Sequence, residues 1–242
     1  MSPPVYKIKN LKHCYHQDAV VLDIADLTVA ASRVIGLYGP NGSGKSTLLK
    51  ILGFIEKPTA GEILFNGQAV TPFSQEMRLK TVFLPQKPYL LKRSVYKNLL
   101  YGLAIRKDTH DHRNRIQEAL AMAGLSFDKF ARRQWNDLSG GEMQRVALAA
   151  RFILKPEILL LDEPTSSLDI RSLHLIKKAV LIASREWKAT CIIASHDRNW
   201  LDEVCDEVLY LFDGKLFPSE NDVKHYLRHM IPPNPDERGP EL

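Results

Sequence analysis

The chain has 242 residues, of which 45% are hydrophobic and 25% are charged, and its formal net charge is +5 at pH 7. These values are typical of a soluble globular protein, large enough for one domain or for a core with a smaller subdomain. Three cysteines without C-x-x-C spacing argue against a disulfide framework and favour a reducing, cytosolic compartment. The start of the chain lacks a signal-peptide core, and no apolar run reaches the roughly 18–20 residues that span a bilayer.

The first third of the chain predicts an antiparallel patch followed by a buried strand. Residues 6–11, 27–30 and 62–65 are short runs rich in apolar and β-branched side chains, which we expect to pair antiparallel. Residues 33–39 form a continuous apolar run that leads directly into a glycine-rich loop. A helical pattern follows from about residue 44 to residue 52.

The remaining elements predict an α/β fold with a mainly parallel core sheet. Residues 81–86 are the next strand, and the pattern is then helical from residue 94 to about residue 154. Apolar strands return at residues 157–163, 189–195 and 207–212, separated by helices, which indicates a parallel sheet covered on both faces. The long helical block interrupts that order, so we expect an inserted helical subdomain at about residues 90–155.

The glycine-rich loop has the spacing of a P-loop, Gly39-x-x-x-x-Gly44-Lys45-Ser46, between a strand and a helix as its mechanism requires. Glycines let the backbone wrap around phosphates, with N–H groups and the helix dipole facing the anion. Lys45 can reach the terminal phosphates, and the Ser46 hydroxyl can ligate Mg²⁺. The alternative, a glycine-rich turn without a ligand, does not explain why every position and both flanking elements fit. The pattern therefore predicts a P-loop NTPase.

Two acids, Asp162 and Glu163, end the apolar strand at residues 157–163. Carboxylates buried at the end of such a strand are costly unless a cation or a proton transfer needs them. Asp162 is then a candidate for the Mg²⁺ shell, and Glu163 for orienting or deprotonating the water that attacks the γ-phosphate. Taken alone, the Asp-Glu-Pro sequence could also simply end a strand at a turn.

A second segment with the character of an anion site, LSGGEMQR, occupies residues 138–145. A small GTPase would need an Asn-Lys-x-Asp motif, which the chain lacks, and a nucleoside kinase would not need this segment. With the P-loop and the Asp-Glu strand, it makes the chain resemble the ATP-binding cassette (ABC) ATPases, whose signature motif is LSGGE or LSGGQ. The resemblance covers nearly the whole chain, about residues 5–217.

The resemblance implies roles for individual residues. Gln86 matches the glutamine that touches Mg²⁺, His196 the histidine that contacts the γ-phosphate, and Tyr15 the aromatic residue that stacks on adenine. It implies that Lys45, Gln86, Glu163 and His196 are catalytic, and that Ser46, Gln86 and Asp162 hold Mg²⁺. The residues that it implies for ATP binding are Tyr15, Gly39, Pro40, Asn41, Gly42, Ser43, Gly44, Lys45, Ser46, Thr47, Ser139, Gly140, Gly141 and Asp169.

Each of these assignments also has a simpler interpretation. A histidine after an apolar strand is commonly a satisfied polar residue, and a glutamine there commonly a surface residue. An aromatic residue near a strand end, such as Tyr15, is often part of the core. The clusters His13-Cys14-x-His16 and His225-x-x-x-His229 have a spacing typical of metal ligands. We interpret these histidines as surface residues, because no third or fourth ligand lies nearby in the sequence.

In the ABC ATPases that this chain resembles, the signature of one subunit completes the nucleotide site of another, and ATP lies between the P-loop and the signature. One P-loop and one signature per chain therefore imply a head-to-tail dimer with a second copy or a similar ATPase. The fold implied is a single ABC-type nucleotide-binding domain over residues 1–230, and residues 231–242, which are polar and rich in proline, form a flexible tail.

Residues 87–103 resemble the groove-forming region of bacterial importers, where a helix of the membrane subunit docks, although an amphipathic core helix has the same pattern. The resemblance then implies an ATPase at the cytoplasmic face of the cell membrane, bound to an integral-membrane permease, with a solute-binding protein in the full system. Segments such as QKPYLL at residues 86–91 are most similar to ATPases of tungstate-type oxyanion importers.

The alternative class is a soluble, non-transport ABC ATPase that acts on nucleic acid or ribosomes. Such proteins usually carry two cassettes in tandem or long coiled-coil insertions, whereas this chain has one cassette and no heptad repeat. Its basic residues are scattered in short pairs such as Arg132–Arg133, not gathered in a block, so we expect a solvated surface and no nucleic-acid partner.

Overall fold

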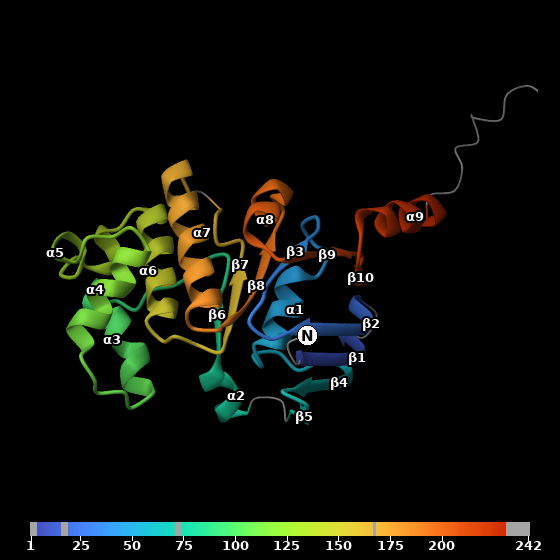
Figure 1. The fold of residues 1–242 in the computed structure, drawn as a ribbon, viewed down its shortest axis with the longest axis horizontal. Helices are drawn as coiled ribbons and strands as arrows, with labels where there is room; N and C mark the ends of the chain where they lie inside the picture. Colours follow the sequence, from blue (N-terminus) through green and yellow to red (C-terminus); the bar gives the residue numbers. More distant parts are fainter. Residues whose placement is uncertain (1–3, 16–18, 71–73, 167, 231–242) are drawn as a thin grey trace, which may run out of the picture.

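A computed structural model describes residues 4–15, 19–70, 74–166 and 168–230, which form two sheets and a set of helices (Figure 1). The smaller sheet is antiparallel and has the strand order β2-β1-β4-β5. Its strands are β1 (Pro4–Cys14), β2 (Val20–Ala30), β4 (Ala60–Phe65) and β5 (Gln68–Ala69). This sheet confirms the predicted antiparallel patch and lies at the blue and teal side of the molecule in Figure 1.

The larger sheet has six strands in the order β10-β9-β3-β8-β7-β6. Its five strands from β9 to β6 run parallel, and only β10 pairs antiparallel, with β9. The strands are β3 (Val34–Tyr38), β6 (Thr81–Leu84), β7 (Ile158–Asp162), β8 (Thr190–Ser195), β9 (Glu207–Phe212) and β10 (Lys215–Phe217). The predicted mainly parallel core sheet is confirmed.

Both faces of the parallel sheet are buried, which explains its unbroken apolar strands. Along β7, Ile158 and Leu160 pack into the cluster shared with α1 (Lys45–Leu52) and the antiparallel sheet. Leu159 and Leu161 point the other way, into the cluster formed with α7 (Ile170–Arg185) and α8 (Arg198–Val204). Successive side chains of a strand face opposite sides, so β7 needs an apolar residue at every position.

A group of helices at the left of Figure 1 has a buried cluster of its own. It comprises α3 (Val95–Ile105), α4 (His112–Met122), α5 (Phe127–Phe130), a 3₁₀ helix (Trp135–Asp137) and α6 (Gly140–Phe152). Helix α6 contributes Val146 and Ala149 to this cluster and Leu148 and Phe152 to the core of the parallel sheet. Helix α6 therefore joins the helical group to the parallel sheet. The domain boundaries expected from the sequence stay a prediction.

The other helices are α2 (Gln75–Lys80) and α9 (Glu220–Met230). No helix within the described residues combines the length and the apolar character that crossing a membrane requires. The tail predicted at residues 231–242 lies outside the described residues.

The register of the parallel strands brings several loops to one edge of the sheet. Leu37 of β3 pairs with Ala194 of β8, Leu161 of β7 pairs with Ile193 of β8, and Leu84 of β6 pairs with Leu161. The carboxyl ends of these four strands are thus nearly level. Residues that follow them in sequence meet there, and this is where ligands of open parallel sheets generally bind.

Candidate active site

The loop between β3 and α1 has the backbone of a phosphate-binding loop. Gly42 and Gly44 have φ values of 84° and 103°, in the left-handed region that favours glycine. A Cβ on Gly39 would lie 2.1 Å from the carbonyl oxygen of Leu211, so no side chain fits there without movement. Among the described residues, no side chain caps the start of α1, which leaves its first amide N–H groups available to an anion.

Lys45 lies across this loop and is 6% exposed. Its Nζ donates to the carbonyl oxygens of Gly39 at 2.7 Å and of Pro40 at 2.9 Å. Burial lowers the pKa of Lys45, and the nearby carboxylates of Glu163 and Asp162 oppose that shift. The ammonium is therefore placed between the loop and two acids, where it can face a phosphate group.

Asp162 and Glu163 are each 4% exposed, as expected from their position at the end of a buried strand. Burial raises the pKa of Asp162, and a hydrogen bond from the Ser46 side chain opposes this rise. Within the described residues, Asp162 Oδ1 and Glu163 Oε1 are buried without a hydrogen-bond partner. Buried oxygens of this kind suit a hard cation, because Mg²⁺ prefers carboxylate and hydroxyl ligands.

These side chains line one cleft of about 370 Å³ at the carboxyl edge of the sheet. The predicted site residues on its wall are Asn41, Gly42, Gly44, Lys45, Ser46, Thr47, Gln86, Asp162 and Glu163. Loop glycines, one ammonium and two carboxylates in one cleft can bind a polyphosphate together with its metal ion.

Glu163 is held by three neighbouring groups. Its Oε2 lies 2.9 Å from Nδ1 of His196 and 3.5 Å from the hydroxyl of Ser195. Its backbone N–H donates to the carbonyl oxygen of Ala194 at 2.9 Å, and its φ of 47° is in the left-handed region. A non-glycine residue in that region is strained, and such strain is common where a side chain must be aimed accurately into a site.

Tyr15 contacts the P-loop helix through a 3.1 Å hydrogen bond between its hydroxyl and that of Thr47. Tyr15 is 46% exposed, and its ring lies edge-on to that of His13, with ring centroids 4.8 Å apart at 89°. The prediction that His13 is a surface residue is wrong, since it is 3% exposed, whereas His225 and His229 are exposed as predicted and His16 lies outside the described residues. It lies on the inward face of β1, the same face as Leu11, so strand alternation decides its burial.

The signature segment lies at the start of α6 and does not line the cleft. Ser139 caps α6, because its hydroxyl accepts from the N–H of Glu142 at 3.3 Å while Glu142 Oε2 accepts from the N–H of Ser139 at 2.8 Å. Asp169 similarly caps α7 by accepting from the N–H of Ser172 at 2.7 Å. The structure therefore leaves these two predicted groups of residues outside the wall of the cleft.

Sequence reasoning missed Arg133 as part of this region. Its Nη1 lies 2.9 Å from Glu142 Oε1, so the signature glutamate is paired with a cation. In the sequence, the pair Arg132–Arg133 indicates only scattered surface charge. A useful signal is the acid at the fifth position of LSGGE, because a carboxylate beside a predicted anion site requires a compensating charge.

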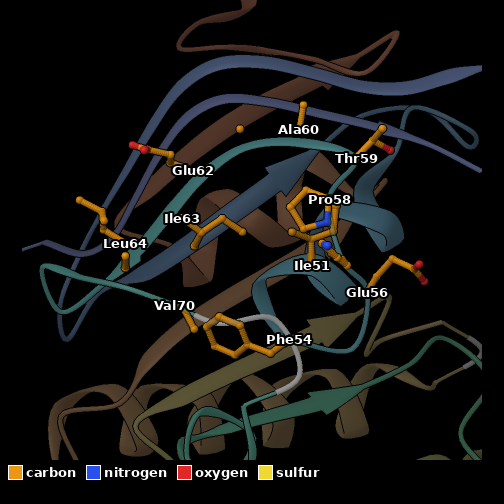
Figure 2. A pocket seen from close by; sticks show the side chains of 13 residues that line it. Ile51, Phe54, Glu56, Pro58, Thr59, Ala60, Glu62, Ile63, Leu64 and Val70 are labelled. Atoms are coloured by element: carbon orange, nitrogen blue, oxygen red, sulfur yellow. The ribbon is translucent and has the colours of Figure 1, made fainter.

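A second pocket, of about 280 Å³, has a different character (Figure 2). Figure 2 shows Phe54, Ile63 and Val70 around an apolar space between the end of α1 and strand β4. It shares no lining residue with the charged cleft, which lies at the opposite end of α1. Its walls lack the glycine loop and the paired acids that phosphate chemistry requires.

The parallel sheet, the P-loop and the Asp-Glu strand end define a P-loop NTPase. The profile of the ABC transporter family matches residues 22–166, which is more than half of the chain. The chain belongs to this family, and it is an ATPase of the ABC type.

Curated relatives are consistent with that assignment. The tungstate uptake system ATP-binding protein TupC of Peptoclostridium acidaminophilum is 36% identical over 86% of this chain and 95% of its own length. The Fe(3+) ions import ATP-binding protein FbpC of Pasteurella multocida is 32% identical over 91% of this chain. The match spans only 63% of that iron-import protein.

Solved structures show the same fold. A dimeric ATP-binding cassette in a post-hydrolysis state, bound to ADP and Pi, has a TM-score of 0.79 and 29% identity. The match covers 87% of this chain and 96% of that one. A subunit of the cbiONQ transporter complex from Clostridium perfringens has a TM-score of 0.77 and 28% identity, with 94% of each chain covered.

Replacing Asp162 by asparagine should stabilise the folded chain in the absence of nucleotide. Because burial raises the pKa of Asp162, the unfolded chain loses that proton first, and the free energy of unfolding falls as the pH rises above about 4. A carboxamide does not titrate, so we expect Asp162→Asn to raise the free energy of unfolding by about 1 kcal/mol at pH 7, or Tm by about 2–4 °C. The same variant should lose Mg²⁺-dependent ATP binding.

Thermal unfolding at pH 7 and at about pH 3 measures this effect, because the carboxyl group and the carboxamide are both neutral near pH 3 and the difference should vanish there. The exposed Asp26 provides a control, since Asp26→Asn should leave Tm unchanged at both pH values. Equal stability of Asp162→Asn and the parent at pH 7 would show that Asp162 carries no burial cost.

Proposed function

We propose that this chain is the ATP-hydrolysing subunit of an importer and that it works as a dimer around two ATP molecules with Mg²⁺. The single observation that carries the hydrolytic part is the buried Glu163 carboxylate, paired with His196 at the edge of the P-loop cleft. A carboxylate held next to the terminal phosphate can orient and deprotonate the attacking water.

The cleft residues divide into binding roles. Residues 39–47 would surround the phosphates, with backbone N–H groups from every position except Pro40, and Lys45 would turn its ammonium from the loop carbonyls toward the terminal phosphates. Ser46, Gln86 and Asp162 would hold Mg²⁺, which supplies charge compensation for the phosphates. Tyr15, half exposed and bonded to Thr47, would stack on adenine.

His196 and Glu163 divide the catalytic work. The imidazole, through Nδ1, orients one oxygen of Glu163, and its exposed ring can contact the γ-phosphate with its other nitrogen. The second oxygen of Glu163 has no partner within the described residues and can accept the proton of the attacking water. Gln86 lines the same cleft and can contact Mg²⁺ bound there.

The signature supports a dimer because it does not line the cleft of its own chain. Ser139, Gly140 and Gly141 begin a helix whose N-terminal end suits a phosphate, yet they do not line the cleft of their own chain. In a head-to-tail dimer they would close on the γ-phosphate bound by the partner, with Asp169 near the same interface. The solved structure of a dimeric ATP-binding cassette with ADP and Pi supports the proposal of a dimer.

The proposed permease contact lies just after Gln86. Tyr89 is 87% exposed, and Leu91, Tyr101 and Ile105 are exposed by 40%, 45% and 58%. Exposed apolar side chains gathered on one segment and the helix that follows it are typical of a docking surface. Binding there would place the ATPase at the cytoplasmic face of the cell membrane, in a system completed by a solute-binding protein.

Tungstate, or a related oxyanion, is the solute we propose. The support is the similarity to the tungstate uptake protein, which extends over 95% of that protein. Relatives named for iron import and for spermidine or putrescine import have similar sequence identities to this chain, 32% and 31%. All of these names support the importer class, whereas the name of the tungstate uptake protein supports the solute.

Replacing Glu163 by glutamine should stop hydrolysis while ATP still binds. The carboxamide keeps the size of the side chain but cannot take up a proton, so we expect turnover to fall about 100-fold or more. Dimers should then accumulate with ATP and Mg²⁺, as measured by light scattering alongside phosphate release. Turnover equal to that of the parent would remove Glu163 from the mechanism.

Adding Ser139→Arg to the Glu163→Gln chain should abolish these dimers. The larger side chain occupies the place proposed for the partner's γ-phosphate, whereas each monomer keeps its own cleft. We expect unchanged binding of a fluorescent ATP analogue by the monomer and no increase in mass on adding ATP. Dimers that persist at the same protein concentration would contradict the role of the signature in trans.

Cells that lack this chain should fail to accumulate tungstate, and the Glu163→Gln form should not restore uptake. Elemental analysis of washed cells measures tungsten, with iron as the control for general transport. Purification from detergent-solubilised membranes should recover an integral-membrane protein with the chain. Normal tungsten uptake would exclude the solute, and salt-sensitive binding to nucleic acid without any membrane partner would favour the soluble class.

A further inference from the structure

The signature of this chain places a negative charge beside its proposed phosphate site. Glu142 Oε2 accepts the N–H of Ser139 at 2.8 Å, within the first turn of α6. That bond lowers the pKa of Glu142, and the side-chain hydrogen bond from Arg133 lowers it further, so the group is a carboxylate at neutral pH. An uncompensated carboxylate would repel the γ-phosphate that the same helix end is expected to attract.

Arg133 supplies the compensating charge from a fixed position. Its Nη1 lies 2.9 Å from Glu142 Oε1, and its Nη2 donates to the carbonyl oxygen of Asp137. Its guanidinium also lies over the ring of Phe130, with the central carbon 4.9 Å from the ring centroid. Only 33% of the Arg133 side chain and 21% of the Glu142 side chain is exposed, so water screens this pair only in part.

The backbone around Arg133 is anchored as well. The N–H of Val95, at the start of α3, donates to the carbonyl oxygen of Arg133 at 2.9 Å, and the N–H of Trp135 donates to the carbonyl oxygen of Arg93 at 3.1 Å. These bonds tie the segment before the signature to the first turn of α3. The arginine is therefore in place before any phosphate arrives, and little reorganisation is needed on binding.

We propose that Arg133 neutralises Glu142 and so enables the N-terminal end of α6 to receive the γ-phosphate of the ATP bound by a second copy. Arg133 is a positioning residue that acts through Glu142 and does not itself touch the nucleotide. The inference rests on the proposed role of Ser139 in trans. It adds that the signature of this chain works as a three-part unit of serine, glutamate and arginine.

A mutant cycle in the Glu163→Gln chain tests this proposal by light scattering in ATP and Mg²⁺ at low ionic strength. Arg133→Met keeps much of the side-chain length and removes the charge, and it should weaken dimerisation roughly tenfold. Arg133→Lys should stay close to the parent. Arg133→Met combined with Glu142→Gln should regain most of the loss, because the charge that needed compensation is gone. Raising the salt concentration should reduce the difference in dimer dissociation constant between Arg133→Met and the parent.

Two measurements separate this effect from general damage. ATP binding by the monomer should be the same in Arg133→Met and the parent, because Arg133 does not line the cleft. Lys177→Met is the matched control, since Lys177 forms a 2.9 Å pair with Glu203 on α7 and α8 and should leave dimerisation unchanged.

The outcomes are distinct. If Arg133→Met dimerises as tightly as the parent, or if Glu142→Gln gives no recovery, Arg133 does not act by neutralising charge and the proposal is overturned. If the Glu163→Gln parent itself forms no dimers with ATP, the trans role of the signature fails and this inference fails with it. That last result is recognised because every member of the cycle then stays monomeric.

Discussion

Two carboxylates and one ammonium are buried within one cleft at the carboxyl edge of the parallel sheet, and the rest of the structure serves this arrangement. Asp162, Glu163 and Lys45 are each at most 6% exposed. Isolated charges at such sites are strongly unfavourable, so each depends on the others and on a ligand that completes the set. The strained φ of Glu163 and the raised pKa of Asp162 are parts of the cost. The sheet can offset that cost because both of its faces are buried in apolar clusters.

The elements that a single periodicity specifies could be predicted from the sequence. The all-apolar run of β7 predicted a doubly covered strand, and the P-loop spacing predicted the strand, turn and helix around Lys45. Asp162 and Glu163 were predictable because buried acids at a strand end have few explanations. The site role of Gln86 was predicted only from the resemblance to the family, yet the parallel register brings this residue to the same cleft.

Features that depend on contacts between distant segments could not be predicted. Whether His13 was buried depended on which face of β1 packs against the core, whereas the lack of a further metal ligand nearby in the sequence favoured the surface. The Arg133–Glu142 pair joins residues nine apart across a 3₁₀ helix, which no helical periodicity brings together. The role of the signature lies beyond one chain altogether, because its proposed ligand is bound by a second copy.

The position of the signature explains why the helical group is attached through α6. This helix packs Leu148 and Phe152 against the sheet that carries the cleft, while Ser139, its N-cap residue, does not line that cleft. In the proposed dimer, the two sites are divided between copies, so closure would depend on ATP, and hydrolysis with loss of phosphate would remove the group that both copies hold. Helix α3 of the same helical group carries part of the exposed apolar surface proposed for the permease. In the proposed complex, the helical group would therefore connect closure of the dimer to the membrane subunit.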